Sequence, residues 1–340
     1  MKRTFLLCFI LLGWLHSAFG QATFNIDGFS EQYYGKVYFS DTTQTASAGW
    51  VEVYDRATKK KLIHVDADEL SFDLYDNPQK AYITKIPYEE QSAILYKDFN
   101  FDGVKDFAII DGFRNWTLGH SFKIFLASSK RFVFSDSFTE LTQDNQGMFT
   151  VNAINKTIST KSKIGDTWYQ YSDYIVENNK PKLIRRHTDD YEHAPFYRET
   201  IEELKGNKMV KTTRSSLALE RYHIEECFKF HVDKVNKDII LCNFYDDRLY
   251  YVILDAKQNV EFYYPFEELR QTSDFIFYRK NGKLTFKNKD ASYTIYDKSG
   301  KIGVDITYKG KIHQWKGNTK SRRGSIGKLL KGSLNNVVYQ

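Results

Sequence analysis

The stretch from residue 98 to residue 106 has the residue types and spacing best suited to chemistry. It reads Asp-Phe-Asn-Phe-Asp-Gly-Val-Lys-Asp, so oxygen-bearing side chains occupy loop positions one, three, five and nine. A hard cation such as Ca²⁺ takes about six to eight oxygen ligands, and alternate side chains of a short loop can supply them. We therefore predict a calcium site with the side chains of Asp98, Asn100, Asp102 and Asp106 as ligands.

The remaining loop positions favour a structural calcium site over a sensor. Gly103 permits the sharp turn, and the carbonyl of Val104 can serve at position seven. Position twelve is Ile109, where a helix-loop-helix EF-hand has a bidentate Glu. Apolar runs at residues 92–96 and 107–110 flank the loop, so we expect it to join two strands and bind calcium at about 10⁻⁴ M. The alternative is an acidic turn that binds nothing.

Other clusters of reactive residues point to chemistry less strongly. Paired acids (Glu89-Glu90, Glu225-Glu226 and Asp246-Asp247) would face opposite sides of a strand, whereas glycosidases need two carboxyl groups on one cleft. Residues 187–193 contain two imidazoles and three carboxylates without a zinc spacing, and we interpret them as a polar linker. The nucleophile elbow, the zinc-protease helix and the P-loop are all absent from the sequence. We expect that the protein is not an enzyme, and the alternative is an enzyme of unrecognised type.

Aromatic residues outside the alternating runs are the best candidates for partner contact. Phe113 and Trp116 follow the acidic loop, and Trp168 and Tyr169 follow a Gly-Asp turn. Tyr and Trp combine large contact area with few rotatable bonds, which suits protein interfaces. Surface aromatics also stack on sugars, so a glycan-binding envelope module is a second hypothesis.

The first twenty residues predict export. Lys2 and Arg3 precede an apolar run at residues 5–15, and small residues follow at Ala18 and Gly20. This is the pattern of a signal peptide cleaved near Gly20, which makes the mature protein periplasmic or secreted. The run is shorter than the roughly twenty residues of a membrane span, and the sequence has no longer one, so we expect a protein that does not span the membrane.

Two cysteines are left after the signal peptide, Cys227 and Cys242. They lie in strand-like runs at residues 222–232 and 238–244, which flank a polar stretch. A hairpin would place them nearly opposite each other, in a compartment where disulfides persist. We predict a disulfide, with two free buried thiols as the alternative.

The charge balance is mildly basic. The chain of 340 residues carries a formal net charge of +6, and many basic residues follow Lys309. Such a charge can favour acidic partners or an anionic envelope surface. The sequence lacks a known nucleic-acid-binding motif, so we predict no nucleic-acid partner.

Short alternating runs rich in Tyr, Phe, Val and Ile predict an all-β, antiparallel protein, either propeller-like or made of two packed β domains. Helical spacing is nearly absent, with short candidates at residues 198–204 and 215–222. The least periodic stretch, 187–211, predicts a boundary or long connection. The expected organisation is a signal peptide (1–20), a β domain with the calcium loop (21–190), a second β-rich domain or continuation (205–317) and a basic tail (318–340).

Residues 88–186 resemble a family of bacterial periplasmic proteins with loops of FG-GAP and EF-hand type. The segment 95–107 is similar to the family's central motif. In the family, further strands follow this motif, and they are resembled here by residues 122–126, 132–134, 155–158 and 171–183. One member of the family is an immunity protein that inhibits a lysozyme-like toxin delivered by a type IV secretion system.

The resemblance implies an envelope inhibitor of a cell-wall hydrolase. By motif match, the family's calcium ligands correspond to Asp98, Asn100, Asp102 and Asp106. Residues 161–169 occupy a place comparable to an inhibitory loop, without a recognisable inhibitor motif. The leading hypothesis is an exported, non-enzymatic calcium-binding β protein that binds a protein partner. The half after Tyr222 has no counterpart in the resemblance.

Overall fold

The structure is a computed structural model that describes residues 21–71, 83–86, 89–129, 131–192, 195–219, 227–244, 247–266 and 273–340. The predicted signal peptide and Glu225-Glu226 lie outside these residues. Within them, the chain forms two compact units. Of the described residues, those from 21 to 188 and from 201 to 211 belong to unit 1, and those from 189 to 200 and from 212 to 340 belong to unit 2. No described helix is long and apolar enough to cross a membrane.

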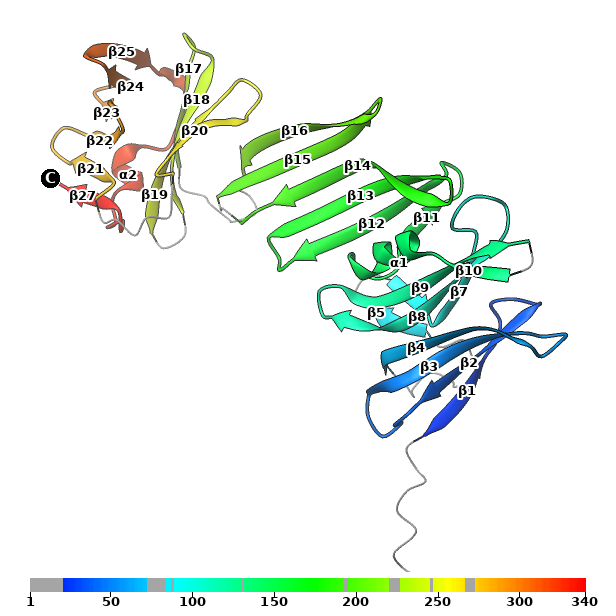
Figure 1. The fold of residues 1–340 in the computed structure, drawn as a ribbon. Helices are drawn as coiled ribbons and strands as arrows, with labels where there is room; N and C mark the ends of the chain where they lie inside the picture. Colours follow the sequence, from blue (N-terminus) through cyan, green and yellow to red (C-terminus); the bar gives the residue numbers. More distant parts are fainter. Residues whose placement is uncertain are drawn as a thin grey trace, which may run out of the picture. The chain divides into compact units, whose positions relative to one another are not determined.

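Unit 1 begins with an antiparallel sheet, which we call sheet I (Figure 1). Strands that are adjacent in this sheet are also consecutive in the chain, so each strand turns back on the one before it. Buried and half-buried residues alternate strictly along the second strand, as expected where one face of a sheet meets a core and the other is only partly covered. The strands are β1 (Ala22–Ile26), β2 (Tyr33–Phe39), β3 (Ala46–Asp55) and β4 (Lys61–Ser71).

Sheet II carries the acidic loop and contains the most buried strand of unit 1 (Figure 1). Residues 106–110 of β8 are at most 1% exposed, without alternation, which is the pattern of a strand covered on both faces. Strand β4 packs against β8, and the helix α1 packs against the neighbouring β9. The elements are β7 (Ile94–Lys97), β8 (Asp106–Asn115), β9 (Gly119–Ser128), β10 (Arg131–Phe134) and α1 (Asp136–Gln143), and a separate pair is β5 (Ile83–Ile86) with β6 (Glu89–Ser92).

Sheet III is a six-stranded antiparallel meander in chain order. Ile158, Tyr174 and Val176 join the core of unit 1, which places one face of the first strands against that core. The dividing line between the units passes through the last three strands, β14, β15 and β16. The strands are β11 (Thr150–Asn152), β12 (Thr157–Ile164), β13 (Trp168–Glu177), β14 (Lys180–Asp190), β15 (Phe196–Lys205) and β16 (Lys208–Leu217).

Sheet III corrects two expectations from the sequence. The predicted connection at 187–211 is mostly strand, and the predicted helix at 198–204 lies within β15. The described part of the second predicted helix, from Ser215, ends β16 without forming a helix. Most side chains of β15 and β16 are exposed or half-buried on both faces. A strand without a buried face needs no apolar alternation, so the pattern that identifies strands was missing.

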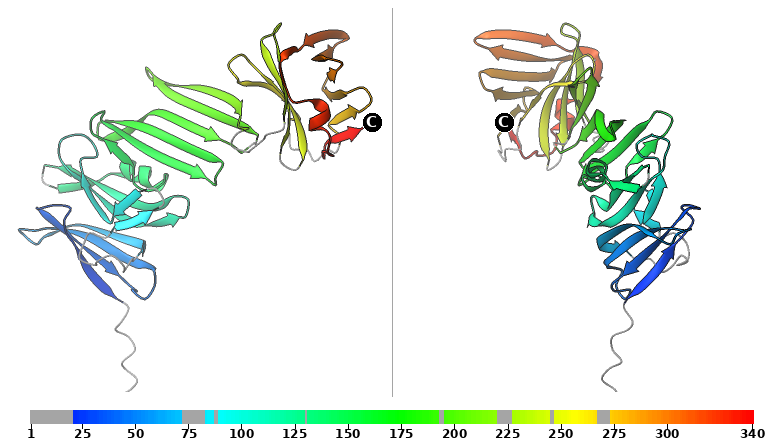
Figure 2. Two further views of the ribbon diagram at one scale, coloured as in Figure 1. Left: turned by 180° about the vertical axis from the view of Figure 1, so that it is seen from behind. Right: turned by 45° about the vertical axis from the view of Figure 1, so that its right-hand side comes forward.

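Besides its share of sheet III, unit 2 contains two sheets that share one apolar core (Figure 2). Sheet IV has the order β20-β19-β18-β17-β26, and sheet V the order β25-β24-β23-β22-β21-β27. The strands are β17 (Cys227–Val232), β18 (Lys237–Phe244), β19 (Arg248–Leu254), β20 (Val260–Tyr264), β21 (Phe275–Tyr278), β22 (Lys283–Asn288), β23 (Ala291–Lys298), β24 (Lys301–Tyr308), β25 (Lys311–Lys316), β26 (Asn318–Arg323) and β27 (Val337–Tyr339).

The predicted basic tail is part of this fold. It forms β26, the short helix α2 (Ile326–Leu329) and β27, which pairs in parallel with β21. Ile326, Leu329 and Leu330 enter the core of unit 2. The all-β prediction is therefore confirmed, as packed antiparallel and mixed sheets.

The predicted cysteine hairpin is present in sheet IV. Strands β17 and β18 pair with Cys227 directly opposite Cys242. Both thiols are free in the structure, and Cys242 is buried. A hydrogen bond to Cys242 lowers the pKa of the Cys227 thiol. The disulfide itself stays a prediction.

We expect this pair to oxidise without rearrangement of the hairpin. Oxidised glutathione should remove two hydrogen atoms from the mature protein, with release of two reduced glutathione molecules, and should block both thiols against alkylation. Closing a loop of about 15 residues should stabilise unit 2 by about 3 kcal/mol, measured by urea unfolding. Cys227→Ser is the control that should not respond. If both thiols still alkylate after oxidation, the predicted disulfide is wrong.

Candidate calcium loop and aromatic hairpin ends

The loop between β7 and β8 folds around its own acidic side chains. Asp98 Oδ2 accepts a hydrogen bond from Gly103 N at 2.9 Å, and Asp102 Oδ1 accepts one from Val104 N at 2.8 Å. Phe101 and Gly103 adopt positive φ angles of 63° and 90°. The chain therefore makes the tight turn that the motif predicts, between the two predicted strands.

Asp106 anchors this loop to sheet II. Its carboxylate is fully buried and accepts hydrogen bonds from Phe99 N at 2.8 Å and from Ala127 N at 2.7 Å. Burial raises the pKa of Asp106 to about 6, and the nearby Asp102 and Asp98 carboxylates also raise it. Because both oxygens bond to the main chain, Asp106 holds the loop against β9, and its role as a direct ligand stays a prediction.

The loop fits a cation best at Asp98. The second carboxylate oxygen, Asp98 Oδ1, is buried and accepts no hydrogen bond. An oxygen left in this state is costly unless a donor or a cation satisfies it. Asn100 Nδ2 donates to Asn179 Oδ1 at 3.1 Å, which ties the loop to the β13–β14 turn. Among the described residues, no three His, Cys, Asp or Glu side chains lie close enough to hold a metal, so Asn100 and main-chain carbonyls such as that of Val104 would have to contribute.

The opposite end of β8 carries an exposed tryptophan on an ordered turn. Trp116 is 93% exposed, and its ring meets Phe113 edge-on, with ring centroids 5.4 Å apart. Asn115 Oδ1 accepts hydrogen bonds from Thr117 N and Leu118 N, both at 2.8 Å. The turn is therefore fixed by its own side chains while the indole stays in solvent.

The β12–β13 hairpin ends with the other two predicted contact residues. Trp168 lies directly opposite Ile164, which is 67% exposed, and Tyr169 follows it. Tyr169 Oη donates to Asp166 O at 3.2 Å across the turn. This hairpin end therefore exposes the apolar side chain of Ile164 next to the charged Asp166.

A single residue that the sequence did not single out connects the two hairpins, through its side chain on one side and its main chain on the other. Gln146 Nε2 donates to Thr117 O at 2.7 Å, and Gln146 N donates to Lys161 O at 2.7 Å. The segment after α1 thereby bridges β8–β9 to β12. Gln146 therefore links the β8–β9 hairpin, which carries Phe113 and Trp116, to the β12–β13 hairpin, which carries Trp168 and Tyr169.

Beneath the end of the β8–β9 hairpin lies a second residue that the sequence did not single out. His120 is 3% exposed, sits opposite Phe113 and has no hydrogen bond at either ring nitrogen. Burial lowers the pKa of His120 to about 4, because a charged ring would lose its hydration there. The imidazole therefore acts as an apolar support for Phe113 at neutral pH.

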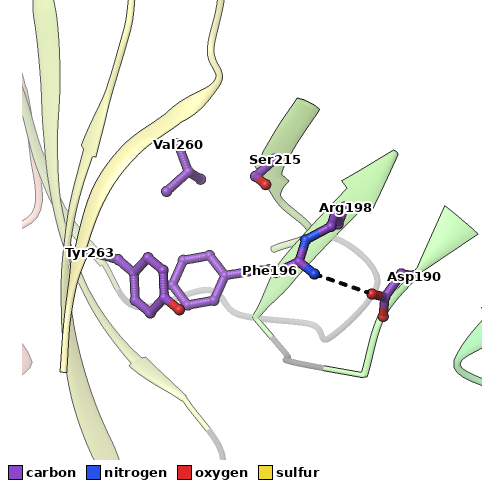
Figure 3. Close-up of a pocket in the computed structure, with 6 residues that line it drawn as sticks. All are labelled: Asp190, Phe196, Arg198, Ser215, Val260 and Tyr263. Carbon is purple, nitrogen blue, oxygen red and sulfur yellow. Dashed lines mark ion pairs between the residues drawn. The ribbon is translucent and has the colours of Figure 1, made fainter. Parts of the chain in front are cut away.

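Unit 2 has a small pocket between β15, β16 and β20 (Figure 3). The rings of Phe196 and Tyr263 form its apolar wall, with centroids 4.2 Å apart. Arg198 Nη1 lies 3.8 Å from Asp190 Oδ2 at the rim. The cavity of about 30 Å³ has room for water but not for a sugar ring, and it offers one carboxylate where a glycosidase needs two.

The other clusters considered from the sequence do not gather into sites. Asp189 and Asp190 end β14, where Asp189 accepts a hydrogen bond from Tyr197 Oη at 2.6 Å. That side of the predicted polar linker is therefore part of a strand and serves its pairing. Asp246 and His193 lie outside the described residues.

No family model and no curated protein match the chain. Among solved structures, a Xanthomonas type IV secretion system related protein is 20% identical over 56% of this chain and 98% of its own, with a TM-score of 0.42. A prolyl endopeptidase structure is 8% identical over 88% of this chain and 42% of its own, with a TM-score of 0.23. TolB from Acinetobacter baumannii is 7% identical over 88% of this chain and 80% of its own, with a TM-score of 0.18. These TM-scores are too low to carry an argument about fold or activity.

The buried His120 makes unit 1 sensitive to acid. Its pKa is about 4 in the folded protein and near 6.5 when unfolded, so the unfolded state binds the proton more readily. The contribution of the uncharged His120 to the free energy of unfolding is complete above about pH 6.5. It is lost as pH falls towards 4, by at most about 1.4 kcal/mol per pH unit. Urea unfolding of His120→Phe between pH 7.5 and 5 should show a smaller loss than the parent protein. His313→Phe, at an exposed position, is the control, and equal losses in all three proteins would refute the assignment.

Proposed function

We propose that the protein is an exported, non-enzymatic, calcium-binding β protein that uses its aromatic hairpin ends to bind a protein partner. The partner we propose is a cell-wall hydrolase, whose activity the bound protein blocks. The observation that carries the proposal is the 93% exposed Trp116 on a turn fixed by Asn115 and Gln146. The resemblance of residues 88–186 to a family with an immunity member supports the choice of partner.

Binding of a partner at the hairpin ends would cost little conformational entropy. Exposed tryptophan gains a large apolar contact on binding, and rigid aromatic anchors lose little conformational entropy. The hydrogen bonds around Trp116 fix the main chain before any partner arrives. Ile164 and Trp168 extend the apolar surface on the linked hairpin. This arrangement favours protein contact over catalysis, because no convergent pair of carboxylates accompanies the described aromatics.

Calcium would act at the other end of β8 as a structural ion. It would neutralise Asp98 and Asp102 near the buried Asp106, whose pKa those carboxylates raise. It would also stabilise the link from Asn100 to the β13–β14 turn. The ion would thereby hold sheets II and III together while the contact residues remain at the opposite end.

The calcium role predicts linked losses of binding and stability. Asp98→Ala with Asp102→Ala should abolish calcium binding in titration calorimetry and remove the rise in melting temperature that calcium causes in the parent protein. Asp290→Ala, in an exposed turn of unit 2, is the matched control. Equal melting of the parent protein with calcium and with chelator would remove the proposed structural role.

The partner-binding role predicts a specific loss of inhibition. The mature protein in calcium should reduce the activity of a lysozyme-type hydrolase captured from envelope extract. Trp116→Ala should raise the concentration needed for half inhibition at least tenfold, as expected for an aromatic hot spot. Tyr308→Ala, which removes an aromatic ring at a 44% exposed position in unit 2, is the control and should have no effect. Capture of polysaccharide alone, without inhibition of any hydrolase, would favour the glycan-binding module.

A further inference from the structure

Sheet V of unit 2 has one face against the core and one face that nothing described covers. The inner positions include Leu284, Phe286, Ile295 and Val304, all of which join the core of unit 2. Alternate residues of the same strands point the other way. These outer residues belong to none of the apolar clusters. The outer face is therefore available to a partner.

The strand register places a continuous row of side chains across this face. Each residue of the row is the direct partner of the next, and cross-strand partners share a face. The row crosses five strands, from β21 to β25, and consists of Tyr278, Lys283, Tyr296, Gly303 and Lys316.

The glycine in this row makes room for an aromatic platform. A Cβ atom at Gly303 would collide with the hydroxyl of Tyr296 and with the carbonyl oxygen of Trp315. The Tyr296 ring therefore lies across the glycine, flat against the sheet. The residue remains half-buried, so one face of its ring is open.

Lysines surround this platform. Lys283 and Lys316 lie in the row, and Lys298 pairs directly with Lys301 at the adjoining hairpin. All four are exposed. The neighbouring carboxylate of Asp297 is turned inward, where it binds Arg322 at 2.9 Å and the N–H of Ile326 at 3.1 Å. Asp297 therefore does not neutralise the four ammonium groups.

The next row of the same face contains an unsatisfied acceptor. Asp305 lies between Thr294 and Gln314 in register. Its Oδ1 atom is buried and accepts no hydrogen bond in the structure. This oxygen is covered by the protein, so a ligand on the outer face does not reach it. The ring of Tyr296 and the exposed lysines therefore define the ligand as one with an apolar face and negative charge.

We propose that the outer face of sheet V binds an anionic, carboxylate-bearing polysaccharide. The apolar C–H face of a sugar ring stacks on Tyr296, and the carboxylates of the polymer pair with the lysines. The surface is flat and extends across five strands, so it suits a polymer better than a small molecule. This site is independent of the hairpin ends of unit 1.

The test uses three probes that separate sugar from charge. Short hyaluronan fragments carry both, N-acetylglucosamine oligomers carry sugar without charge, and poly-glutamate carries charge without sugar. The mature protein should bind hyaluronan fragments at least tenfold more tightly than either other probe in titration calorimetry. Binding should weaken as salt rises, because exposed charges are screened. If poly-glutamate bound as tightly as the hyaluronan fragments, the face would recognise negative charge alone, and the proposal would be overturned.

Matched variants locate the site. Tyr296→Ala and the double variant Lys283→Gln with Lys301→Gln should each weaken hyaluronan binding at least tenfold. Lys287→Gln, on the same face but at the other end of β22, should leave binding within twofold of the parent. The lysine variants alter exposed side chains only, so they test the face even if Tyr296→Ala unfolds. Unchanged binding in the lysine double variant would overturn the proposal, whatever the outcome for hydrolase inhibition.

Discussion

The burial of β8 on both faces is the constraint on which unit 1 depends. Residues 106–110 are at most 1% exposed, so a layer must cover each side of the strand. Strand β4 packs against β8, while α1 packs against its neighbour β9. The buried Asp106 begins this strand, and its hydrogen bonds to Phe99 N and Ala127 N fix where the strand starts. The acidic loop and the Trp116 turn are therefore held at opposite ends of one rigid element.

The two proposed surfaces use different physical means of recognition. At the hairpin ends of unit 1, an exposed indole projects from a turn that hydrogen bonds hold in place. On sheet V of unit 2, Tyr296 lies flat, and exposed lysines surround it. A projecting aromatic can enter a cleft on a protein, whereas a flat charged face suits a polymer. The two proposals together describe a protein that binds a hydrolase at one surface and an anionic polysaccharide at the other.

The fold could be predicted where a strand has one buried face. The alternating run at residues 36–39 lies within β2, and the cysteine runs form β17 and β18 in the expected register. Prediction failed at 198–204, because most residues of β15 are half-buried or exposed on both faces and its sequence carries no alternation. The basic tail also gave no strand pattern, since β26 and β27 form by pairing with distant strands. Local sequence contains little information about such partners.

The sequence by itself determined the acidic loop, because its ligand spacing, glycine turn and flanking strands are all local properties. It also marked Phe113, Trp116, Trp168 and Tyr169, since aromatics beside turns stand out from an alternating pattern. Only the tertiary structure decided that Gln146 joins their hairpins, that His120 is buried without a partner, and that Tyr296, the lysines and Asp305 share one face. The reason is that register between strands and the burial of a polar group depend on residues far apart in the chain.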